Sequence, residues 1–148
     1  MREERSAVTR WIQIEATYVP RSRPPRMILE FNELPWSDAT LVAVFVDRSK
    51  PGNQDEVVVH VRWPDGRNEQ VTFVECRGAR LALNFGVLGE DTIERAYVDD
   101  GSEVLADCRQ RWAASGVLLP ELRCFRIETC TTGSSLDILA MGWRVDPQ

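Results

Sequence analysis

Residues 56–76 read EVVVHVRWPDGRNEQVTFVEC, and this stretch decides the fold because it encodes two strands and the turn between them. Every second residue from Val57 to Trp63 is apolar, which is the two-residue period of a strand with one buried face. In the turn that follows, Pro64 presets φ and Gly66 supplies the positive φ that closes a hairpin. We therefore predict an antiparallel hairpin here.

Further strands are predicted on both sides of this hairpin. Residues 39–46 are an apolar, β-branched run of strand length, and residues 28–31 are a shorter candidate. Residues 80–87 also alternate, with one apolar face formed by Leu81, Leu83 and Phe85. A second hairpin closes the chain, with strands at 122–130 and 136–145 around a polar connection.

One segment has the spacing of a helix. Ser102 is a good N-cap, and Glu103 follows in the first turn, where the helix dipole favours negative charge. Gly116 is a plausible C′ residue and Pro120 prevents the helix from resuming. The apolar stripe at helical spacing consists of Val104, Leu105, Cys108, Trp112 and Ala113. We predict an α+β fold: an antiparallel β-sheet of about six to eight strands built from hairpins, with one principal α-helix at about residues 102–115.

Length and composition indicate one folded domain. The chain has 148 residues, of which 43% are hydrophobic and 28% charged, values ordinary for a globular protein. We assign residues 27–148 to a single α+β domain. Residues 1–26 are predicted to be a basic N-terminal appendage, in which an alternating strand at 8–19 leads into a proline-rich linker.

Charge is unevenly distributed along the chain. The net charge is −5, but residues 1–26 hold six arginines and three glutamates, while residues 27–148 hold 12 basic and 20 acidic groups. An acidic body repels phosphate backbones and favours cationic partners. This distribution counts against nucleic acid as the main ligand, although the surplus also fits a simple role in solubility.

Neither terminus nor interior carries a membrane signal. The first five residues bear charges of both signs, no apolar signal-peptide core follows them, and no stretch has the length of a membrane span. We therefore expect a cytoplasmic protein with no membrane association. In that compartment the four cysteines stay reduced, and we expect buried, small hydrophobic roles for Cys76, Cys108, Cys124 and Cys130.

The common catalytic and metal-binding patterns are missing from the sequence. His60 is the only histidine and lies in the middle of a predicted strand, where a structural role is more common than a catalytic one. No two cysteines have zinc-site spacing, and the glycines at 86 and 89 lack the lysine of a phosphate loop. The carboxylates of residues 99–103 fit helix capping better than a calcium loop. We expect no enzymatic activity, no metal and no cofactor.

Tryptophans and acidic residues provide the candidate binding surface. Trp36 and Trp63 lie at the edges of predicted elements, where they would be either half-exposed interface residues or part of the rim of the core. The candidate partner-binding residues are Trp36, Asp38, Asp55, Glu56, Trp63, Glu90, Asp91, Asp99 and Asp100. Spacing along the chain does not reveal which of them share a face.

Residues 34–41, LPWSDATL, lead into the strand at 42–47 and resemble the opening of small bacterial immunity-type proteins. These proteins begin with a short aromatic–histidine–aspartate–alanine element before the first long strand of an antiparallel sheet. Ser37 stands where the histidine is usual. Later segments are similar in order and spacing, and the resemblance covers about residues 34–145. The matching later segments are Trp63–Gly66, Val71–Phe73 and Arg126–Glu128.

This resemblance implies a non-enzymatic protein that binds and neutralises a toxin, and a basic toxin would complement the acidic body. The alternative is a stand-alone ligand-binding or scaffold domain with an unrelated partner. A hydrolase that uses His60 is a third reading, and nucleic-acid binding through the N-terminal arginines is a fourth. The oligomeric state remains open.

Overall fold

The computed structural model describes residues 30–148, and the predicted appendage at residues 1–26 lies outside this range. The helix of the described part is α2 (Glu103–Ala114). The strands are β1 (Thr40–Val46), β2 (Val57–Arg62), β3 (Asn68–Val74), β4 (Gly78–Ala82), β5 (Ile93–Val98), β6 (Arg123–Thr129), β7 (Ser135–Ala140) and β8 (Gly142–Pro147).

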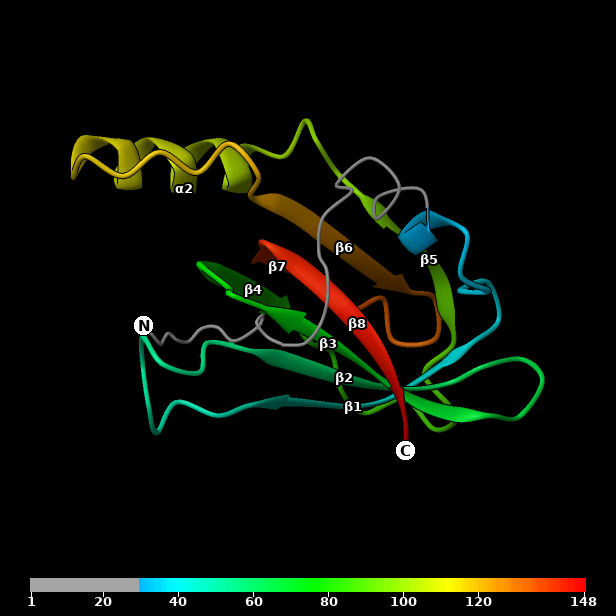
Figure 1. Ribbon diagram of the computed structural model, residues 1–148. Coiled ribbons are helices and arrows are strands. Elements are labelled where there is room, and N and C mark those ends of the chain that lie inside the picture. The colour runs from blue at the N-terminus through cyan, green and yellow to red at the C-terminus, as the bar shows by residue number, and fades with distance from the viewer. Residues whose placement is uncertain (1–29) are drawn as a thin grey trace.

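The strands form two antiparallel sheets of four, ordered β1-β2-β3-β8 and β4-β7-β6-β5 (Figure 1). Strands and one labelled helix agree with the predicted mixture of elements and with the predicted number of strands. The expectation of one sheet is wrong. The chain passes between the sheets twice, from β3 to β4 and from β7 to β8. These two segments are adjacent and bend together at the corner described below.

The hairpin predicted from residues 56–76 is confirmed as β2 and β3, which pair in register from Val57↔Phe73 to Arg62↔Asn68. Alternate residues of β2 are buried, as its two-residue period requires. The turn closes with the Trp63 amide donating to the Arg67 carbonyl at 2.9 Å, and Gly66 takes φ +93°. Local sequence therefore places this hairpin at the centre of the first sheet.

The two sheets join at a corner where the register shifts by one residue. Val74 pairs with Gly142 and Gly78 pairs with Leu139, so four steps along one segment face three along the other. Glu75 absorbs the extra residue at φ +50°. As a result, the strand predicted as continuous over 136–145 is two strands in different sheets.

A second junction lies between the starts of β1 and β5. Thr40 bridges Thr92, the Leu41 amide donates to the Asp91 carbonyl at 2.9 Å, and the Ile93 amide donates to the Ala39 carbonyl at 2.7 Å. No strand was predicted at residues 93–98, where β5 lies. This strand fixes the acidic end of the preceding loop against β1.

The main core lies between the sheets and includes a short helical turn at residues 30–32, where a strand was expected. Phe31 is fully buried and makes ring contacts with Trp36, Phe73, Phe125 and Trp143. The Trp36 indole also donates to the Phe31 carbonyl at 2.8 Å, which holds the turn against the core.

Helix α2 covers one end of the second sheet and is bounded as predicted. The Ser102 hydroxyl accepts from the Leu105 amide at 3.2 Å, and Gly116 follows the helix at φ +87°. Leu105 and Cys108 pack with Leu139 in a second small core, whereas Ala113 is exposed and does not belong to the buried stripe. Figure 1 shows α2 extending past the end of β6. Within residues 30–148, no helix combines the length and apolarity needed to span a membrane.

Candidate protein-binding surface

Residues 79–90, which we name the edge segment, are all exposed. They comprise most of β4, the edge strand of the second sheet, and the chain that follows it. Five large apolar side chains lie here: Leu81 and Leu83 are each 40% exposed, Phe85 84%, Val87 51% and Leu88 99%. A concentration of apolar side chains in contact with water is typical of an interaction surface.

The pairing of β4 explains why these side chains stay uncovered. Leu81 pairs with Leu136, and paired residues direct their side chains to the same face of a sheet. Leu136 is fully buried in the core, but β4 has a strand neighbour on one side only among the described residues. The apolar row therefore runs past the edge of the core, where no described element covers it.

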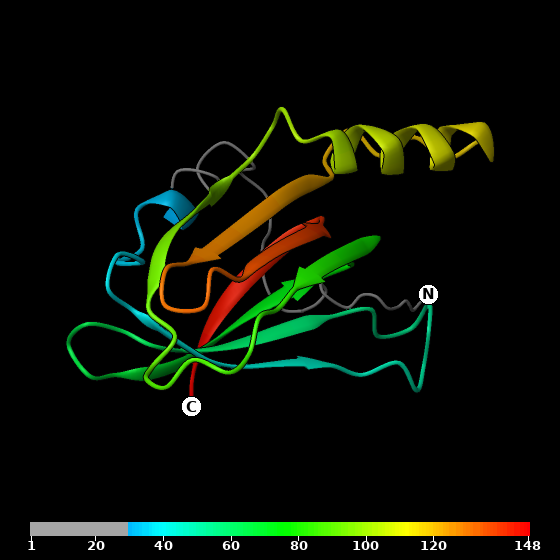
Figure 2. The same ribbon diagram turned by 180° about the vertical axis from the view of Figure 1, so that it is seen from behind.

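Asn84 anchors the edge segment near its middle. The Asn84 amide donates to the Ser134 hydroxyl at 2.9 Å, and its side-chain amide donates to the carbonyls of Thr132 and Gly133 at 3.0 Å. From residue 85 to 89, no backbone hydrogen bond joins the segment to another described residue. Figure 2 shows a bent loop between β4 and β5, and residues 85–89 lie in it.

The far end of the segment is also fixed. Glu90 forms an ion pair with Arg62 of β2, and the Asp91 carboxylate accepts from the Thr132 hydroxyl at 3.1 Å. With Asn84, these contacts hold the apolar side chains on a defined path. Such preorganisation reduces the entropy that a partner must overcome on binding.

Acidic residues gather at the start of the segment, around Cys76. The Cys76 amide donates to the Asp55 carbonyl at 2.9 Å. Burial raises the pKa of the Cys76 thiol to about 12; a backbone hydrogen bond opposes the rise, and the carboxylates of Glu56, Asp55 and Glu75 add to it. Glu90 and Asp91 lie at the other end, so the apolar segment has acidic groups on both flanks.

The two tryptophans of the candidate set do not reach the surface. Trp36 and Trp63 are 3% and 2% exposed and lie in the main core with ring centroids 5.1 Å apart. The Trp63 indole donates to the Glu69 carboxylate at 2.6 Å. Of the two readings left open for them, this burial fits core packing and not half-exposed contact residues, because the turn at residues 30–36 and the β2–β3 hairpin enclose both rings.

The acidic candidates are dispersed. Asp55 and Glu56 lie beside Cys76, whereas Asp38, Glu90 and Asp91 lie along the β1–β5 junction, where the Asp38 amide donates to the Ile93 carbonyl at 3.1 Å and the Asp91 carbonyl accepts from the Leu41 amide. Asp99 and Asp100 lie at the opposite end of β5, about 20 Å along the strand. The Asp99 carboxylate accepts from the Gly101 amide at 3.2 Å, and Asp100 lies 3.9 Å from Arg123, so both support the approach to α2.

The edge segment itself was missed as a binding surface. Its alternation predicts a strand with one buried face, and β4 is indeed a strand as far as Ala82. The signal that could have identified it is the pair of glycines at 86 and 89. They interrupt an apolar run that contains no charged residue until Glu90, so this run is not a regular buried strand. The strand ends at Ala82, and Gly86 beyond it takes φ +91°, a conformation outside the strand region.

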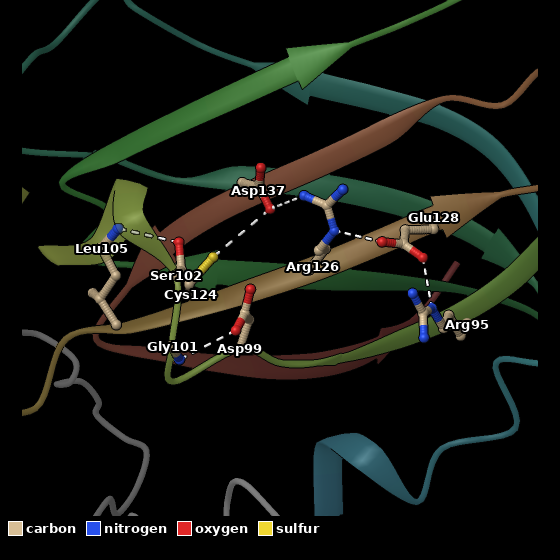
Figure 3. A network of polar contacts seen from close by, with 9 residues as sticks. All are labelled: Arg95, Asp99, Gly101, Ser102, Leu105, Cys124, Arg126, Glu128 and Asp137. Carbon is tan, nitrogen blue, oxygen red and sulfur yellow. Dashed lines mark hydrogen bonds and ion pairs between the residues drawn. The ribbon is translucent and has the colours of Figure 1, made fainter. Parts of the chain in front are cut away.

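A chain of ion pairs covers the outer face of the second sheet (Figure 3). Arg126 lies between Asp137, at 2.7 Å, and Glu128, at 2.5 Å, and Glu128 also accepts from Arg95 at 2.6 Å. Burial alone would raise the pKa of Glu128, but the hydrogen bonds from Arg126 and Arg95 lower it below its usual range. Each carboxylate is paired with an arginine. This network of ion pairs, rather than a layer of apolar side chains, therefore covers the outer face of the second sheet and stabilises it.

The remaining reactive side chains are dispersed. His60 contacts the Phe45 ring, with ring centroids 4.7 Å apart, and lies 2.9 Å from the Gln148 side-chain amide. Cys108 and Cys124 are buried as expected, but Cys76 is half-buried and Cys130 is exposed, which corrects the expectation for these two. Within residues 30–148, no three His, Cys, Asp or Glu side chains are placed to hold a metal ion.

Comparison with protein families and with curated proteins adds no relative. No protein-family model matches the chain, and no curated protein matches it at a significant level. The geometry described above is therefore the basis for a functional assignment.

Proposed function

We propose that this chain is a non-enzymatic protein-binding module that holds its partner on the edge segment, and that it serves as an immunity protein against a basic toxin. The supporting observation is the run of five exposed apolar side chains from Leu81 to Leu88 on a segment that Asn84 and Asp91 hold in place. Its largest members, Phe85 and Leu88, are the natural anchors for a complementary pocket.

The edge position favours recognition of an extended strand. An unpartnered edge presents backbone donors and acceptors to an incoming strand, while pockets for alternate side chains give specificity. Residues 85–89 have no backbone hydrogen bond to other described residues and begin three positions after the end of β4. A strand of the toxin would add to β4 and continue along this stretch.

Charge supports a basic partner. Residues 27–148 hold 20 acidic and 12 basic groups, and acidic side chains flank the edge segment at Asp55, Glu56, Glu90 and Asp91. Complementary charge raises the association rate and disfavours wrong partners more than it adds affinity. Basic side chains on either side of an apolar strand would match this arrangement.

Co-expression tests the proposal. A host that carries the product of the adjacent gene should grow when the wild-type chain is present and should stop growing without it. A Phe85→Ser/Leu88→Ser variant should lose protection, while Phe45→Ser, a matched change at a 53% exposed phenylalanine on β1, should retain it. Absence of both binding and protection by the wild type would overturn the proposal.

The alternative is a scaffold domain that assembles through the same edge. The observation that favours it is the open side of β4, since edge strands also pair with a second copy of their own chain. Sedimentation of the purified protein separates the two readings: a scaffold associates with itself, and that association would be lost in Phe85→Ser/Leu88→Ser.

A further inference from the structure

A cavity of about 640 Å³ that is open to solvent lies between α2 and β4. Arg77 and Arg80 line it from the β4 side, and Arg111 and Asp107 line it from the helix. The volume is in the range of pockets that take small molecules. Ala79 and Arg80 belong to both the edge segment and the cavity lining, but none of the five exposed apolar side chains from Leu81 to Leu88 lines the cavity.

The three arginines of the cavity have no ion-pair partner among the described acidic residues. By contrast, six of the eleven arginines in residues 30–148 are paired with carboxylates. The paired ones are Arg62, Arg67, Arg95, Arg123, Arg126 and Arg144. Asp107 is the only acidic residue in the lining, so the cavity carries a formal charge of about +2.

Arg77 is held in position at the rim. Its guanidinium lies over the Trp112 ring, 4.5 Å from the centroid, and its backbone amide donates to the Leu139 carbonyl at 2.8 Å. Stacking on an aromatic ring orders the guanidinium and leaves its N–H groups free to bind. The donors are thus arranged before a ligand arrives.

Apart from Gln110, the rest of the lining is apolar. Leu139 is 1% exposed, and Val104 and Ala114 contribute further apolar surface from α2. Cationic donors around an apolar wall match a ligand that has a charged group attached to an uncharged body.

We propose that this cavity binds a small molecule that carries a phosphate monoester on an apolar body. The guanidinium fork matches phosphate oxygens in bidentate geometry, and a phosphate monoester has nearly two negative charges at pH 7, which balance the lining. A long polyanion would extend over the acidic body and be repelled by it. A small anion interacts only with charges within a Debye length of about 8 Å, where the arginines of the cavity predominate.

Calorimetric titration of the full chain with phenyl phosphate, inorganic phosphate and benzoate tests this proposal. Phenyl phosphate should bind saturably and more tightly than either other probe. In Arg80→Gln/Arg111→Gln its affinity should fall at least about tenfold. The control is Arg48→Gln, which removes an exposed arginine of the β1–β2 loop and should change the affinity less than about twofold.

Three results would overturn the proposal: no saturable binding of phenyl phosphate, unchanged affinity in the double variant, or an equal loss in the control. Tighter binding of benzoate than of phenyl phosphate would also overturn the proposal, because the cavity would then prefer a carboxylate to a phosphate monoester. Circular dichroism of the double variant should match the wild type, because both arginines are exposed; if it does not, Arg111→Lys is titrated instead. That variant keeps the charge but loses the fork, so it should still weaken binding of phenyl phosphate.

Discussion

The indole rings of Trp36 and Trp63 pack edge to face in the main core, 5.1 Å between centroids at an interplanar angle of 68°. Each ring also satisfies its polar atom: Trp36 donates to the Phe31 carbonyl and Trp63 to the Glu69 carboxylate. Buried tryptophans with both contacts stabilise a fold. Their role is therefore to join the turn at residues 30–36 to the β2–β3 hairpin.

Replacing either tryptophan should be costly. We expect Trp63→Ala to lower the free energy of unfolding by about 3–5 kcal/mol, since it removes a large side chain from the core. Phe85→Ala, an 84% exposed site, should change it by less than about 0.5 kcal/mol. Urea denaturation measures both values. A small loss in Trp63→Ala would place that ring outside the core.

Asp38 has a backbone role that a binding experiment must take into account. It takes φ +70° while its amide donates to the Ile93 carbonyl, so its conformation is one that glycine adopts freely and β-branched residues resist. Asp38→Val should therefore cost about 1–2 kcal/mol in unfolding free energy, while Asp38→Gly should cost little. Thermal melts of the two variants would contradict this role if Val were tolerated as well as Gly.

Acid should weaken the ion-pair chain at Glu128. Because the folded-state pKa of Glu128 lies below its unfolded value of about 4.5, the stabilisation is present above that value and is lost as pH falls through the folded pKa. Glu128→Gln should be less stable than the wild type by about 1–3 kcal/mol at pH 7, and the gap should narrow below pH 4. Urea titrations across this range check the trend. Glu121→Gln, at an exposed site, serves as the control and should show no such gap.

Cys130 should be alkylated before the other three cysteines. With a pKa of about 12 at Cys76 and about 11 at Cys124, both thiols stay protonated at pH 8 and react slowly with iodoacetamide, which requires the thiolate. Cys130 is exposed, and we expect it to be alkylated first. Peptide mass spectrometry follows each site. Modification of Cys76 ahead of Cys130 would contradict the described burial.

Features set by short-range interactions could be predicted from the sequence. The Pro64–Arg67 turn and the Ser102 cap each depend on a few neighbouring residues, and the structure places both as expected. The corner at Met141 could not be predicted, because the apolar alternation of residues 136–145 continues across it. Only the pairing of Val74 with Gly142 and of Gly78 with Leu139 reveals the change of sheet.

The candidate site was less predictable, because it too depends on contacts between residues that are far apart in the sequence. Alternating Leu81, Leu83 and Phe85 predict a buried face, but burial depends on a covering layer that only the tertiary fold provides. Trp36 is the opposite case, a residue whose position next to Pro35 favours exposure but whose side chain is buried. Its ring packs against those of Phe31 and Trp63. Asp38 and Asp91 both lie at the junction of β1 with β5, and β5 was not predicted from the sequence.

Calorimetric titration of the purified chain with the product of the adjacent gene tests the binding surface most directly. The wild type should bind, and Phe85→Ser/Leu88→Ser should weaken the affinity by at least about 100-fold, as expected when two anchoring side chains are removed. Phe45→Ser should stay within about threefold of the wild type. Equal affinity of the wild type and the edge-segment variant would contradict the assignment of the edge segment as the binding surface.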